Sequence, residues 1–584
     1  MDKLFGSMNA FRVTDSDGDF SGEHLGVRVA THEFTRNVVK YGGYDAYHFL
    51  LGRGTHSDEE IQAYMTAHGL DANSIRIFEG GMPLELIKAT PYHVLNRADP
   101  YLCEEIALRR IANHPLAPLT GMTHTISDAL LMPIWTRMLL GHVLFCDAIV
   151  CTSAAVREAL ERTLRLLSDR WSTRFGTKVP TFRGMLKVIP LGVDVEQWRP
   201  ASSKAQARSR LDLPEERCII LSPARFSTRD KQDLRPVLLA AHKLLTVLGR
   251  DCFRIVLVGD DMRTEGGESG LIQGFVDKLG LTDVVKIDTN GAPSRIKEYY
   301  QAADVFISLV DNVQETFGLT PVQAMACGLP VVVSDWDGYR DTVVHGETGF
   351  RIRTCWTECD DEISDYAQEG PSLTNHLLLA QSVAIDINEL VECLHALVTH
   401  PDLRARFGQA GRKRAEQLYA WPVVIAQYRD LWDECSERFR FIDIQEWRNE
   451  DREDIFSPSY YHRFGHYASH AISSATPLTL ASTRDEAVSM PDPVKSVLLP
   501  AEMRVALLPK VFQAIEVRLA DGRVPFGVLA ESVGEEMEQP QHLVARHIMW
   551  LMKYGRIEPV FHENTCWDGS CSRRERGRKV ATKP

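Results

Sequence analysis

Residues 313–351 read VQETFGLTPVQAMACGLPVVVSDWDGYRDTVVHGETGFR, and this stretch decides the fold. Glu315 to Gly318 read as a turn and Leu319 to Ala326 as a short helix, which Gly328 ends because glycine readily takes the left-handed conformation found after helices. Leu329 to Ser334 is an apolar, β-branched run, which is typical of a strand buried on both faces. The sequence therefore predicts a loop, a helix and a buried parallel strand in succession.

The start of the predicted helix is suited to binding phosphate. A helix that begins just after Gly318 points its unpaired N–H groups and the positive end of its dipole at the preceding turn. Pro321 lies in the first turn, where its missing N–H costs no hydrogen bond. The sequence thus predicts an anion site in front of Leu319.

The same stretch resembles the donor-binding signature of retaining glycosyltransferases of the GT-B fold, family 4. In that family two glutamates are separated by seven residues, within the block E-x-F-G-x-x-x-x-E-A-M-A-x-G-x-P-V-V. This chain has Glu315 at the first position and Gln323 at the second, so the second carboxylate is replaced by an amide. The rest of the block matches at Phe317, Gly318, Ala324 to Ala326, Gly328, Pro330, Val331 and Val332.

The resemblance implies a role for each residue of the site. Glu315 is expected to contact hydroxyls of the donor sugar, and Gln323 takes the ribose position. Leu319 and Thr320 are expected to offer backbone N–H groups to the diphosphate. The catalytic residues implied are Glu315, Arg225, Lys231 and His124, and the donor-binding residues implied are Gly318, Leu319, Thr320, Gln323, Phe317, Gly22 and Gly26.

Arg225 and Lys231 follow an apolar predicted strand, Cys218 to Ser222. When a sugar leaves its nucleotide, the diphosphate gains negative charge, which two cations and a helix N-terminus can stabilise without a metal. We therefore expect metal-independent transfer and no cofactor, with the nucleotide sugar as a substrate. Arg229 and Arg235 are nearby alternatives for this role.

Residues 1 to about 195 alternate between predicted strands and helices. Gly22 to Gly26 precede Val27 to Tyr41, whose apolar residues have roughly helical spacing, and Tyr47 to Leu51 reads as the next strand. A glycine loop before a helix and a strand is typical of the first unit of a doubly wound sheet. His124 follows a turn, at a place where the family often has a histidine near the donor sugar; a loop or core histidine satisfied by its neighbours is the alternative.

The predicted fold class is α/β, of the GT-B type, with two Rossmann-like, doubly wound domains facing a cleft and a small, mainly helical C-terminal domain. The predicted divisions are an N-terminal acceptor-side domain (1–197), a nucleotide-sugar donor domain (198–437), an extended connection (438–500), a winged-helix-like domain (501–562) and a basic tail (563–584). The start of the donor domain, up to Arg210, is interpreted as a polar linker.

The winged-helix-like segment is expected to bind no specific nucleic acid. Residues 501–560 contain seven Lys and Arg against eight Asp and Glu, whereas DNA readers normally show a basic face. The tail at residues 573–583 is basic, with six Lys and Arg and one Glu, and such tails are usually solvated.

Composition indicates a cytoplasmic protein with reduced thiols. The 584 residues carry a net charge of −13, which argues against nucleic acid as the general partner. The twelve cysteines show no repeated spacing. The N-terminus lacks the apolar region of a signal peptide, and the longest apolar stretch, residues 129–156, is too interrupted to span a membrane. The expected partners are a nucleotide sugar, an unidentified acceptor and, as one possibility, further copies of the chain.

Two cysteine and aspartate patterns fall short of a metal site. Asp15, Asp17 and Asp19 have calcium-loop spacing, but Phe20 and Gly26 occupy the positions that require glycine and glutamate. Cys566 and Cys571 lack a second pair at the spacing that a zinc site requires. We therefore expect no bound metal.

The sequence favours a glycosyltransferase that moves a sugar from a nucleoside diphosphate sugar to an unidentified acceptor with retention at the anomeric carbon. Two alternatives stay open. One is a nucleotide-sugar epimerase of related fold. The other is a nucleotide-sugar-binding regulator, in which Gln323 marks lost catalysis and the C-terminal domain contacts a partner or DNA.

Overall fold

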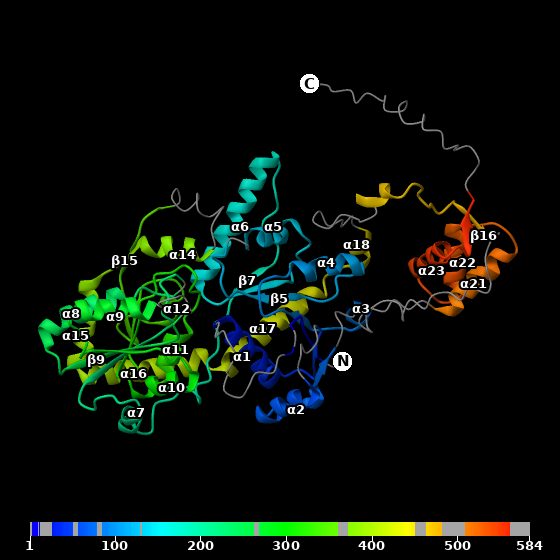
Figure 1. Ribbon diagram of the computed structural model, residues 1–584. Helices are drawn as coiled ribbons and strands as arrows, with labels where there is room; N and C mark the ends of the chain where they lie inside the picture. Colours follow the sequence, from blue (N-terminus) through cyan, green and yellow to red (C-terminus); the bar gives the residue numbers. More distant parts are fainter. Residues whose placement is uncertain are drawn as a thin grey trace. The chain divides into compact units, whose positions relative to one another are not determined.

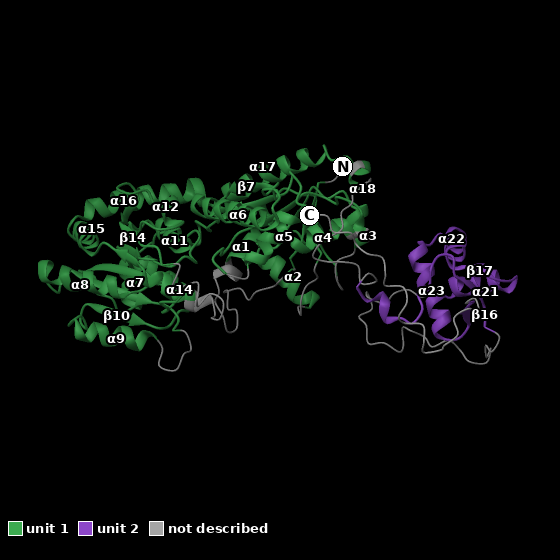
Figure 2. Ribbon diagram, turned by 90° about the horizontal axis from the view of Figure 1, so that it is seen from above, with its two compact units in different colours: residues 1–456 green, residues 457–584 purple. Residues whose placement is uncertain are grey.

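The chain divides into two compact units, residues 1–456 and 457–584 (Figure 2). The computed structural model describes residues 3–9, 11, 26–50, 57–78, 84–128, 131–229, 231–261, 268–359, 372–449, 463–481 and 508–560. The first unit contains two parallel sheets. We call the part around the seven-stranded sheet the first lobe and the part around the six-stranded sheet the second lobe (Figure 1).

The first lobe is built on a sheet with the strand order β3-β2-β1-β4-β5-β6-β7, in which all neighbouring strands are parallel. The strands are β1 (Leu4–Ser7), β2 (Ala46–Phe49), β3 (Ile75–Ile77), β4 (Val94–Asn96), β5 (Leu119–Met122), β6 (Ala148–Cys151) and β7 (Met185–Val188). The helices are α1 (Gly26–Tyr41), α2 (Asp58–Ala67), α3 (Leu84–Ala89), α4 (Cys103–Ala112), α5 (Leu131–Leu140) and α6 (Ala154–Phe175). The strand order reverses between β1 and β4.

Both faces of this sheet are buried. Successive residues of a strand point to opposite faces, and the apolar residues divide accordingly. Val94 and Val150 belong to one hydrophobic cluster, whereas their neighbours Leu95 and Ile149 belong to another. This two-sided burial explains why the strands are short apolar runs rather than alternating ones.

The second lobe repeats the plan with the strand order β10-β9-β8-β11-β12-β13, again fully parallel. The strands are β8 (Cys218–Pro223), β9 (Phe253–Val258), β10 (Val285–Asp288), β11 (Val305–Ser308), β12 (Val331–Ser334) and β13 (Gly349–Ile352). The helices are α7 (Lys204–Arg210), α8 (Arg235–Leu248), α9 (Glu268–Lys278), α10 (Pro293–Ala302), α11 (Leu319–Ala326) and α12 (Tyr339–Thr342). The two sheets confirm the predicted pair of Rossmann-like domains.

The signature stretch folds as the sequence predicts. Residues Leu319–Ala326 form α11 and Val331–Ser334 form the buried strand β12. Gly328 follows the helix with a φ of +75°, in the left-handed region that glycine takes most readily. The helix start and its preceding turn therefore stand at the carboxyl edge of β11.

The remaining elements of the first unit complete the second lobe and return to the first. They are β14 (Thr354–Trp356), α14 (Ser372–Gln381), β15 (Val383–Ile385), α15 (Ile387–Thr399), α16 (Pro401–Arg414), a π-helix (Ala415–Tyr419), α17 (Trp421–Phe439) and α18 (Ile444–Asn449). Helix α17 packs on α1. Its Trp432 donates to the Thr120 hydroxyl at 3.2 Å, and its Asp433 pairs with Lys3 at 2.6 Å, so the chain crosses back to the first lobe.

The interpretation of residues 198–210 as a linker was wrong over its second half. Ser203 accepts a hydrogen bond from the N–H of Gln206 and caps α7. Arg208 is buried, donates to the carbonyl of Ala302 at 3.0 Å and pairs with Asp304. The sequence of α7 is polar and therefore looks like that of a loop. The helix is held to the lobe by a buried ion pair and not by an apolar face.

The second unit contains a three-stranded antiparallel sheet with the order β17-β16-β18. Its elements are a 3₁₀ turn (Gly465–Tyr467), β16 (Pro477–Leu480), α21 (Pro509–Ala520), β17 (Val524–Pro525), α22 (Phe526–Glu536), α23 (Gln541–Lys553) and β18 (Ile557–Pro559). The three helices agree with the predicted mainly helical C-terminal domain. The central strand β16, in contrast, lies in residues 438–500, which we expected to be an extended connection.

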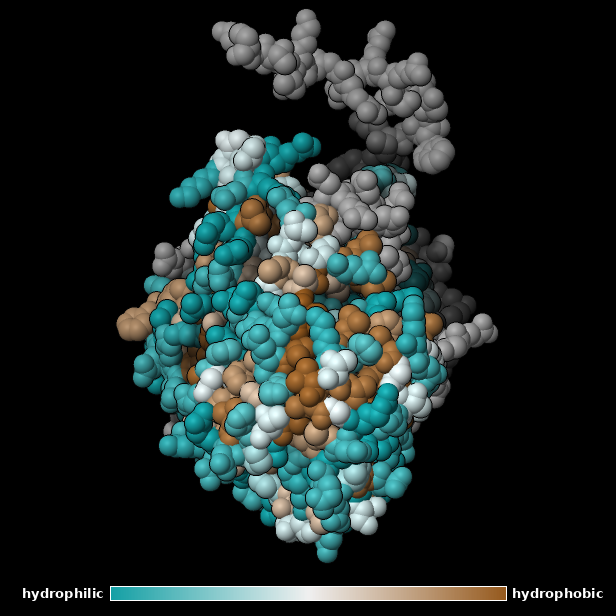
Figure 3. Space-filling view, turned by 90° about the vertical axis from the view of Figure 1, so that its left-hand side faces the viewer, coloured by the Kyte–Doolittle hydropathy of each residue, from teal (hydrophilic) through white to brown (hydrophobic). Residues whose placement is uncertain are grey.

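The described residues include no helix that is both long and apolar enough to cross a membrane. Viewed from the side of the second lobe, the molecule presents a largely hydrophilic surface with apolar residues gathered near its centre (Figure 3). Exposed apolar side chains occur on both lobes. Examples are Val247 and Leu271 on the second lobe and Leu166 and Phe175 on the first.

Candidate active site

The predicted phosphate-binding residues meet at the carboxyl edge of the second sheet. Arg225 and Lys231 follow β8, and the turn from Glu315 to Gly318 follows β11. Strands β8 and β11 are neighbours, and the strand order reverses between them. Ligands of doubly wound sheets bind outside the carboxyl ends of the strands at such a reversal.

The loop that carries Arg225 and Lys231 is fixed by two buried amides. Gln232 accepts a hydrogen bond from the N–H of Leu309 at 2.8 Å and donates to the Ser222 hydroxyl at 3.3 Å. Asn312 donates to the carbonyl of Arg229 at 2.6 Å. These bonds hold the loop against β8, β11 and the start of the signature stretch.

The three cations of this loop differ in exposure. The side chains of Arg225 and Lys231 are half-buried, whereas Arg229 is exposed. Within the described part of the chain, the Lys231 ammonium has no hydrogen bond or ion pair. Lys231 is therefore available to an anion, and its role in phosphate binding stays a prediction.

Glu315 holds the turn before α11. Its carboxylate accepts a hydrogen bond from the N–H of Gly318 at 3.0 Å. Gly318 has a φ of +88°, and a Cβ at this position would lie 2.2 Å from the ring of Tyr339, so only glycine fits. The N–H groups of Leu319 and Thr320 lie in the first turn of α11, where no helical carbonyl can pair with them.

A second carboxyl group, Asp337, lies near Glu315 and was missed in the sequence analysis. Burial and the neighbouring Glu315 carboxylate raise the pKa of Asp337 well above its ordinary value. Asp337 also has a φ of +45°, an uncommon conformation for a residue other than glycine. Tyr339 lies beneath the same turn, where its hydroxyl is 2.8 Å from that of Ser308.

Asp311 is a third acidic group of this region. It is 5% exposed, and one of its carboxylate oxygens has no hydrogen-bond partner among the described residues. Burial and the nearby Asp233 raise the pKa of Asp311 to about 7. The group therefore changes charge near neutral pH.

Two residues of the signature differ in accessibility. Gln323 lies half-buried on α11, and no hydrogen bond of its side-chain amide occurs among the described residues. Phe317 is 2% exposed and packs against Tyr419, with ring centroids 5.7 Å apart. The Phe317 side chain thus belongs to the core, and its role in donor binding stays a prediction.

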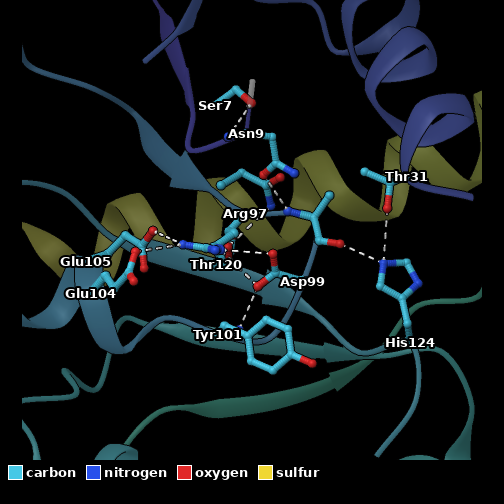
Figure 4. Close-up of polar contacts among 12 residues, drawn as sticks. Ser7, Asn9, Thr31, Arg97, Asp99, Tyr101, Glu104, Glu105, Thr120 and His124 are labelled. Carbon is cyan, nitrogen blue, oxygen red and sulfur yellow. Dashed lines mark hydrogen bonds and ion pairs between the residues drawn. The ribbon is translucent and has the colours of Figure 1, made fainter. Parts of the chain in front are cut away.

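His124 lies at the carboxyl edge of the first sheet, just after β5. Its Nε2 atom is 2.6 Å from the carbonyl of Ala98 and 3.4 Å from the Thr31 hydroxyl (Figure 4). Because a carbonyl only accepts, Nε2 carries the hydrogen and Nδ1 is left as the acceptor nitrogen. Burial lowers the pKa of His124, so the ring is neutral at pH 7.

An ionic cluster stands beside His124, at the reversal of the first sheet between β1 and β4. Arg97 donates to Asp99 at 2.9 and 3.0 Å and to Glu105 at 2.7 Å (Figure 4). Glu105 is 1% exposed, and its burial raises its pKa. The two carboxylates hold the guanidinium in place, so Arg97 has a structural role at this edge of the sheet.

The two lobes meet at the signature turn. The Ser153 hydroxyl, at the start of α6, donates to the carbonyl of Thr316 at 2.7 Å. The next backbone N–H, that of Ala154, donates to Asp341 of α12 at 2.6 Å. The end of β6 is therefore attached to the turn that precedes α11.

Several predicted residues are not described. Gly22, the acidic triplet and the cysteine pair near the C-terminus lie outside the described residues, and Gly26 is the first residue of α1. Among the described residues no group of three or more His, Cys, Asp or Glu could hold a metal ion.

The residues that the sequence analysis missed share one signal. All are polar residues that follow a buried strand by one to nine positions, on the side of the sheet where ligands bind. They are Gln232, Asp311, Asn312, Asp337, Tyr339, Arg97, Asp99 and Glu105.

Comparisons with known proteins place the match in the second lobe. Residues 203–377 match the family described as Glycosyl transferases group 1. A D-inositol 3-phosphate glycosyltransferase of Acidothermus cellulolyticus is 34% identical over 168 residues, which are 29% of this chain and 37% of that protein. A protein of the same name from Streptomyces avermitilis is 32% identical over 265 residues, 44% of this chain and 48% of that protein.

The chain thus spans less than half of the length of each of these two curated relatives. Among solved structures, a glycosyltransferase from Rickettsia africae matches with a TM-score of 0.49 and 15% identity, over 74% of this chain and 98% of that one. Sucrose-phosphate synthase from Thermosynechococcus elongatus matches with a TM-score of 0.46 and 17% identity, over the same shares of the two chains.

Proposed function

We propose that the glycosyl transferases group 1 domain at residues 203–377 serves a glycosyltransferase that uses a nucleoside diphosphate sugar, retains the anomeric configuration and needs no metal. One observation carries this proposal. Two cationic side chains, Arg225 and Lys231, share the reversal point of the second sheet with the N-terminus of α11 and the carboxylate of Glu315. A diphosphate fits the cations and the helix N-terminus, and sugar hydroxyls fit the carboxylate.

In the proposed step, the bond between the anomeric carbon and the diphosphate oxygen breaks, and its electron pair stays on the diphosphate. The acceptor hydroxyl forms the new bond on the same face of the sugar, and its proton passes to the leaving diphosphate oxygen. Arg225, Lys231 and the N–H groups of Leu319 and Thr320 stabilise the charge that grows on this oxygen. They therefore favour the transition state over the bound substrate.

Carboxyl groups and a neutral imidazole would position the sugar. Glu315 and Asp337 can accept hydrogen bonds from sugar hydroxyls, and a protonated Asp337 can also donate one. His124 presents Nδ1 as an acceptor because its Nε2–H is bound to Ala98. We assign these three residues to donor-sugar contacts.

The acceptor is a separate question, because the family match lies wholly in the second lobe. The names of the relatives make D-inositol 3-phosphate the first acceptor to test. In the first lobe, however, Arg97 is already paired with Asp99 and Glu105. We therefore propose testing inositol and other unphosphorylated polyols in parallel.

Turnover of a panel of nucleotide sugars tests the proposal directly. The full chain is incubated with each donor and each acceptor, with and without EDTA, and the product anomer is assigned by NMR. We expect nucleoside diphosphate release that depends on the acceptor, survives EDTA and gives the anomer of the donor. Release that requires a metal, or an inverted product, would contradict the metal-free retaining mechanism.

Gln323 supports a second candidate, a nucleotide-sugar-binding regulator. In that case the protein would bind a nucleoside diphosphate sugar by calorimetry and leave it intact with every acceptor. Conversion of the donor to an epimer, detected in the same assay, would instead support the related epimerase reaction.

A further inference from the structure

Helix α6 has an apolar stripe along one face. This stripe continues along the helix beyond the last residues that are buried against the first lobe. Leu160, Leu164 and Ser168 are buried at intervals of four residues. Trp171 and Phe175 continue this face, because they lie seven and eleven residues after Leu164. Figure 1 shows the helix projecting past α5, and Phe175 is 60% exposed.

Half-buried Trp171 and exposed Phe175 form an aromatic platform. The rings of Trp171 and Phe175 stack with centroids 5.3 Å apart and an interplanar angle of 12°. Leu166, on the opposite side of the helix, is 57% exposed. Phe175 is therefore largely exposed at this end of the helix, although helices of globular proteins normally bury such a stripe.

The same segment is strongly basic. Residues 154–184 contain seven Lys and Arg and three Asp and Glu, a net charge of +4 in a chain whose total is −13. The cations Arg162, Arg165, Arg170 and Arg174 are exposed along the helix. The positive charge is therefore a local property of α6 and the turn that follows it.

A polar groove of about 580 Å³ extends this basic surface toward the second lobe. Three arginines of α6, two arginines of the second lobe and three carboxylates line it, and these residues are Arg157, Arg162, Arg165, Arg340, Arg351, Glu158, Glu161 and Asp341.

The arginines of this groove are incompletely paired. Arg162 pairs with Glu158, and Arg157 lies 3.6 Å from Glu161. Arg351 donates to the carbonyl of Arg340 at 3.0 Å and lies 3.5 Å from Asp335, whereas the exposed Arg165 makes no ion pair among the described residues. The groove therefore retains capacity for phosphate oxygens, which arginine binds well.

We propose that this surface, the outer half of α6 with the adjoining groove, docks the chain on a membrane rich in anionic lipids. Aromatic residues beside arginines are the combination that interfacial helices use, with rings at the headgroup boundary and cations on lipid phosphates. Nucleic acid is a less favoured ligand for this surface. The Trp171 ring is already stacked on Phe175, and the aliphatic side chain of Leu166 cannot stack with or hydrogen-bond to a base. The proposal does not depend on the proposed transfer activity.

Vesicle sedimentation with the full chain tests the docking surface. We expect binding to vesicles of phosphatidylcholine mixed with phosphatidylglycerol, little binding to phosphatidylcholine alone, and weaker binding as salt is raised. Each arginine near an anionic surface contributes on the order of 1 kcal/mol, or about fivefold in affinity. The pair of changes Arg170→Gln and Arg174→Gln should therefore weaken binding by roughly tenfold or more.

Matched substitutions distinguish docking through this surface from nonspecific hydrophobic binding to vesicles. Trp171→Ser with Phe175→Ser should reduce vesicle binding while the melting temperature stays near that of the wild type, because Phe175 is exposed and Trp171 belongs to no hydrophobic core cluster of the described residues. Leu271→Ser is the control, since Leu271 is 76% exposed on α9 of the second lobe. Its vesicle binding should equal that of the wild type.

Four outcomes would overturn the proposal. The first is that the chain shows no preference for anionic vesicles. The second is that Leu271→Ser loses as much vesicle binding as the change of Trp171 and Phe175. The third is that the chain binds single-stranded RNA and not vesicles. The fourth is a change in oligomeric state, measured by light scattering, when Trp171 and Phe175 are replaced, since this face would then join copies of the chain.

Discussion

Ser153 and Thr316 are joined by a hydrogen bond that crosses the two lobes of the first unit. The Ser153 hydroxyl donates to the Thr316 carbonyl at 2.7 Å and accepts from the N–H of Val156 at 3.1 Å. Both residues are buried. One hydroxyl thus caps α6 and fixes the turn that begins the proposed donor site.

Replacing this hydroxyl should cost stability and activity together. Ser153→Ala removes a helix cap, worth about 1 kcal/mol, and leaves a buried carbonyl unpaired, which costs about 1–3 kcal/mol. We expect a lower urea midpoint and reduced transfer. Ser203→Ala is the matched control, because Ser203 caps α7 and its hydroxyl makes no bond to any described residue of the first lobe. Equal effects of the two changes would show that the bond between the lobes contributes nothing.

Asp311 should make the stability of the second lobe depend on pH. Its carboxyl has an ordinary pKa of 3.8 and a raised pKa of about 7 in the folded chain, so folding favours the protonated form. Its contribution is fully present below about pH 4 and is lost as the pH rises through 7. Asp311→Asn should leave unfolding in urea unchanged at pH 4 and increase stability at pH 8, by up to roughly 4 kcal/mol.

Asp304 provides a control of opposite sign. Its pKa is lowered despite burial, because Lys204, the N–H of Ile219 and Arg208 stabilise the carboxylate. Its contribution is therefore present above its ordinary pKa and is lost as the pH falls. Asp304→Asn should destabilise the chain at pH 8 and less so at pH 4. A pH-independent difference between Asp311→Asn and the wild type would refute the assignment for Asp311.

Local sequence was sufficient for the parts of the fold whose signals are local. The helix from Leu319 to Ala326 is bounded by glycines, and β12 is a continuous β-branched run, so both follow from a few neighbouring residues. Helix α7 was missed because the ion pair that holds it joins Arg208 to Asp304, far along the chain. Strand β16 was missed because its partners, β17 and β18, follow it by more than forty residues.

The candidate site divides in the same way. Gly318 and the α11 N-terminus were predictable from neighbouring residues, and Glu315 was nominated by the resemblance to the family signature. Asp337 was not, since its proximity to Glu315 depends on how the loops after β11 and β12 fold against each other. The cluster of Arg97 with Asp99 and Glu105 likewise needs the three-dimensional end of β4. Polar residues after buried strands are the signal that would have nominated both.

Gln323→Glu should strengthen nucleotide binding. An amide hydrogen bond contributes about 0.5–1.5 kcal/mol, and one to a charged group about 1.5–3 kcal/mol. We therefore expect the nucleoside diphosphate to bind up to roughly tenfold tighter in calorimetry. Weaker or unchanged affinity would mean that position 323 does not contact the ribose, or that the local field disfavours a carboxylate.

The C-terminal unit should bind no duplex DNA specifically. Its described helices, α21, α22 and α23, lie in residues 501–560, which carry seven basic and eight acidic residues and so lack the charge that neutralises phosphates. A mobility-shift titration of the full chain at physiological salt should show no sequence preference. A selective shift that disappears when residues 501–584 are deleted would contradict this prediction.

Arg225 and Lys231 should show the proposed mechanism most clearly. Both lie on the loop that Gln232 and Asn312 tie to the signature turn, so their positions are set before a substrate binds. Charge on a leaving diphosphate rises as the sugar bond breaks, and preorganised donors then contribute most. Removing one such donor typically lowers the rate by about 10²–10³. We expect Arg225→Ala and Lys231→Ala each to lower kcat by about this factor, with melting temperatures near that of the wild type.

Arg229→Ala is the control for both variants, because the Arg229 side chain is exposed and the Asn312 bond to this residue uses only its backbone carbonyl. Its kcat should remain close to that of the wild type. EDTA should leave transfer by the wild type intact, since the two cations and the α11 N-terminus occupy the role that a metal would otherwise have. If Arg229→Ala is as damaging as the other two variants, the loop acts through its general charge or folding. Loss of transfer in EDTA would instead place a metal on the diphosphate.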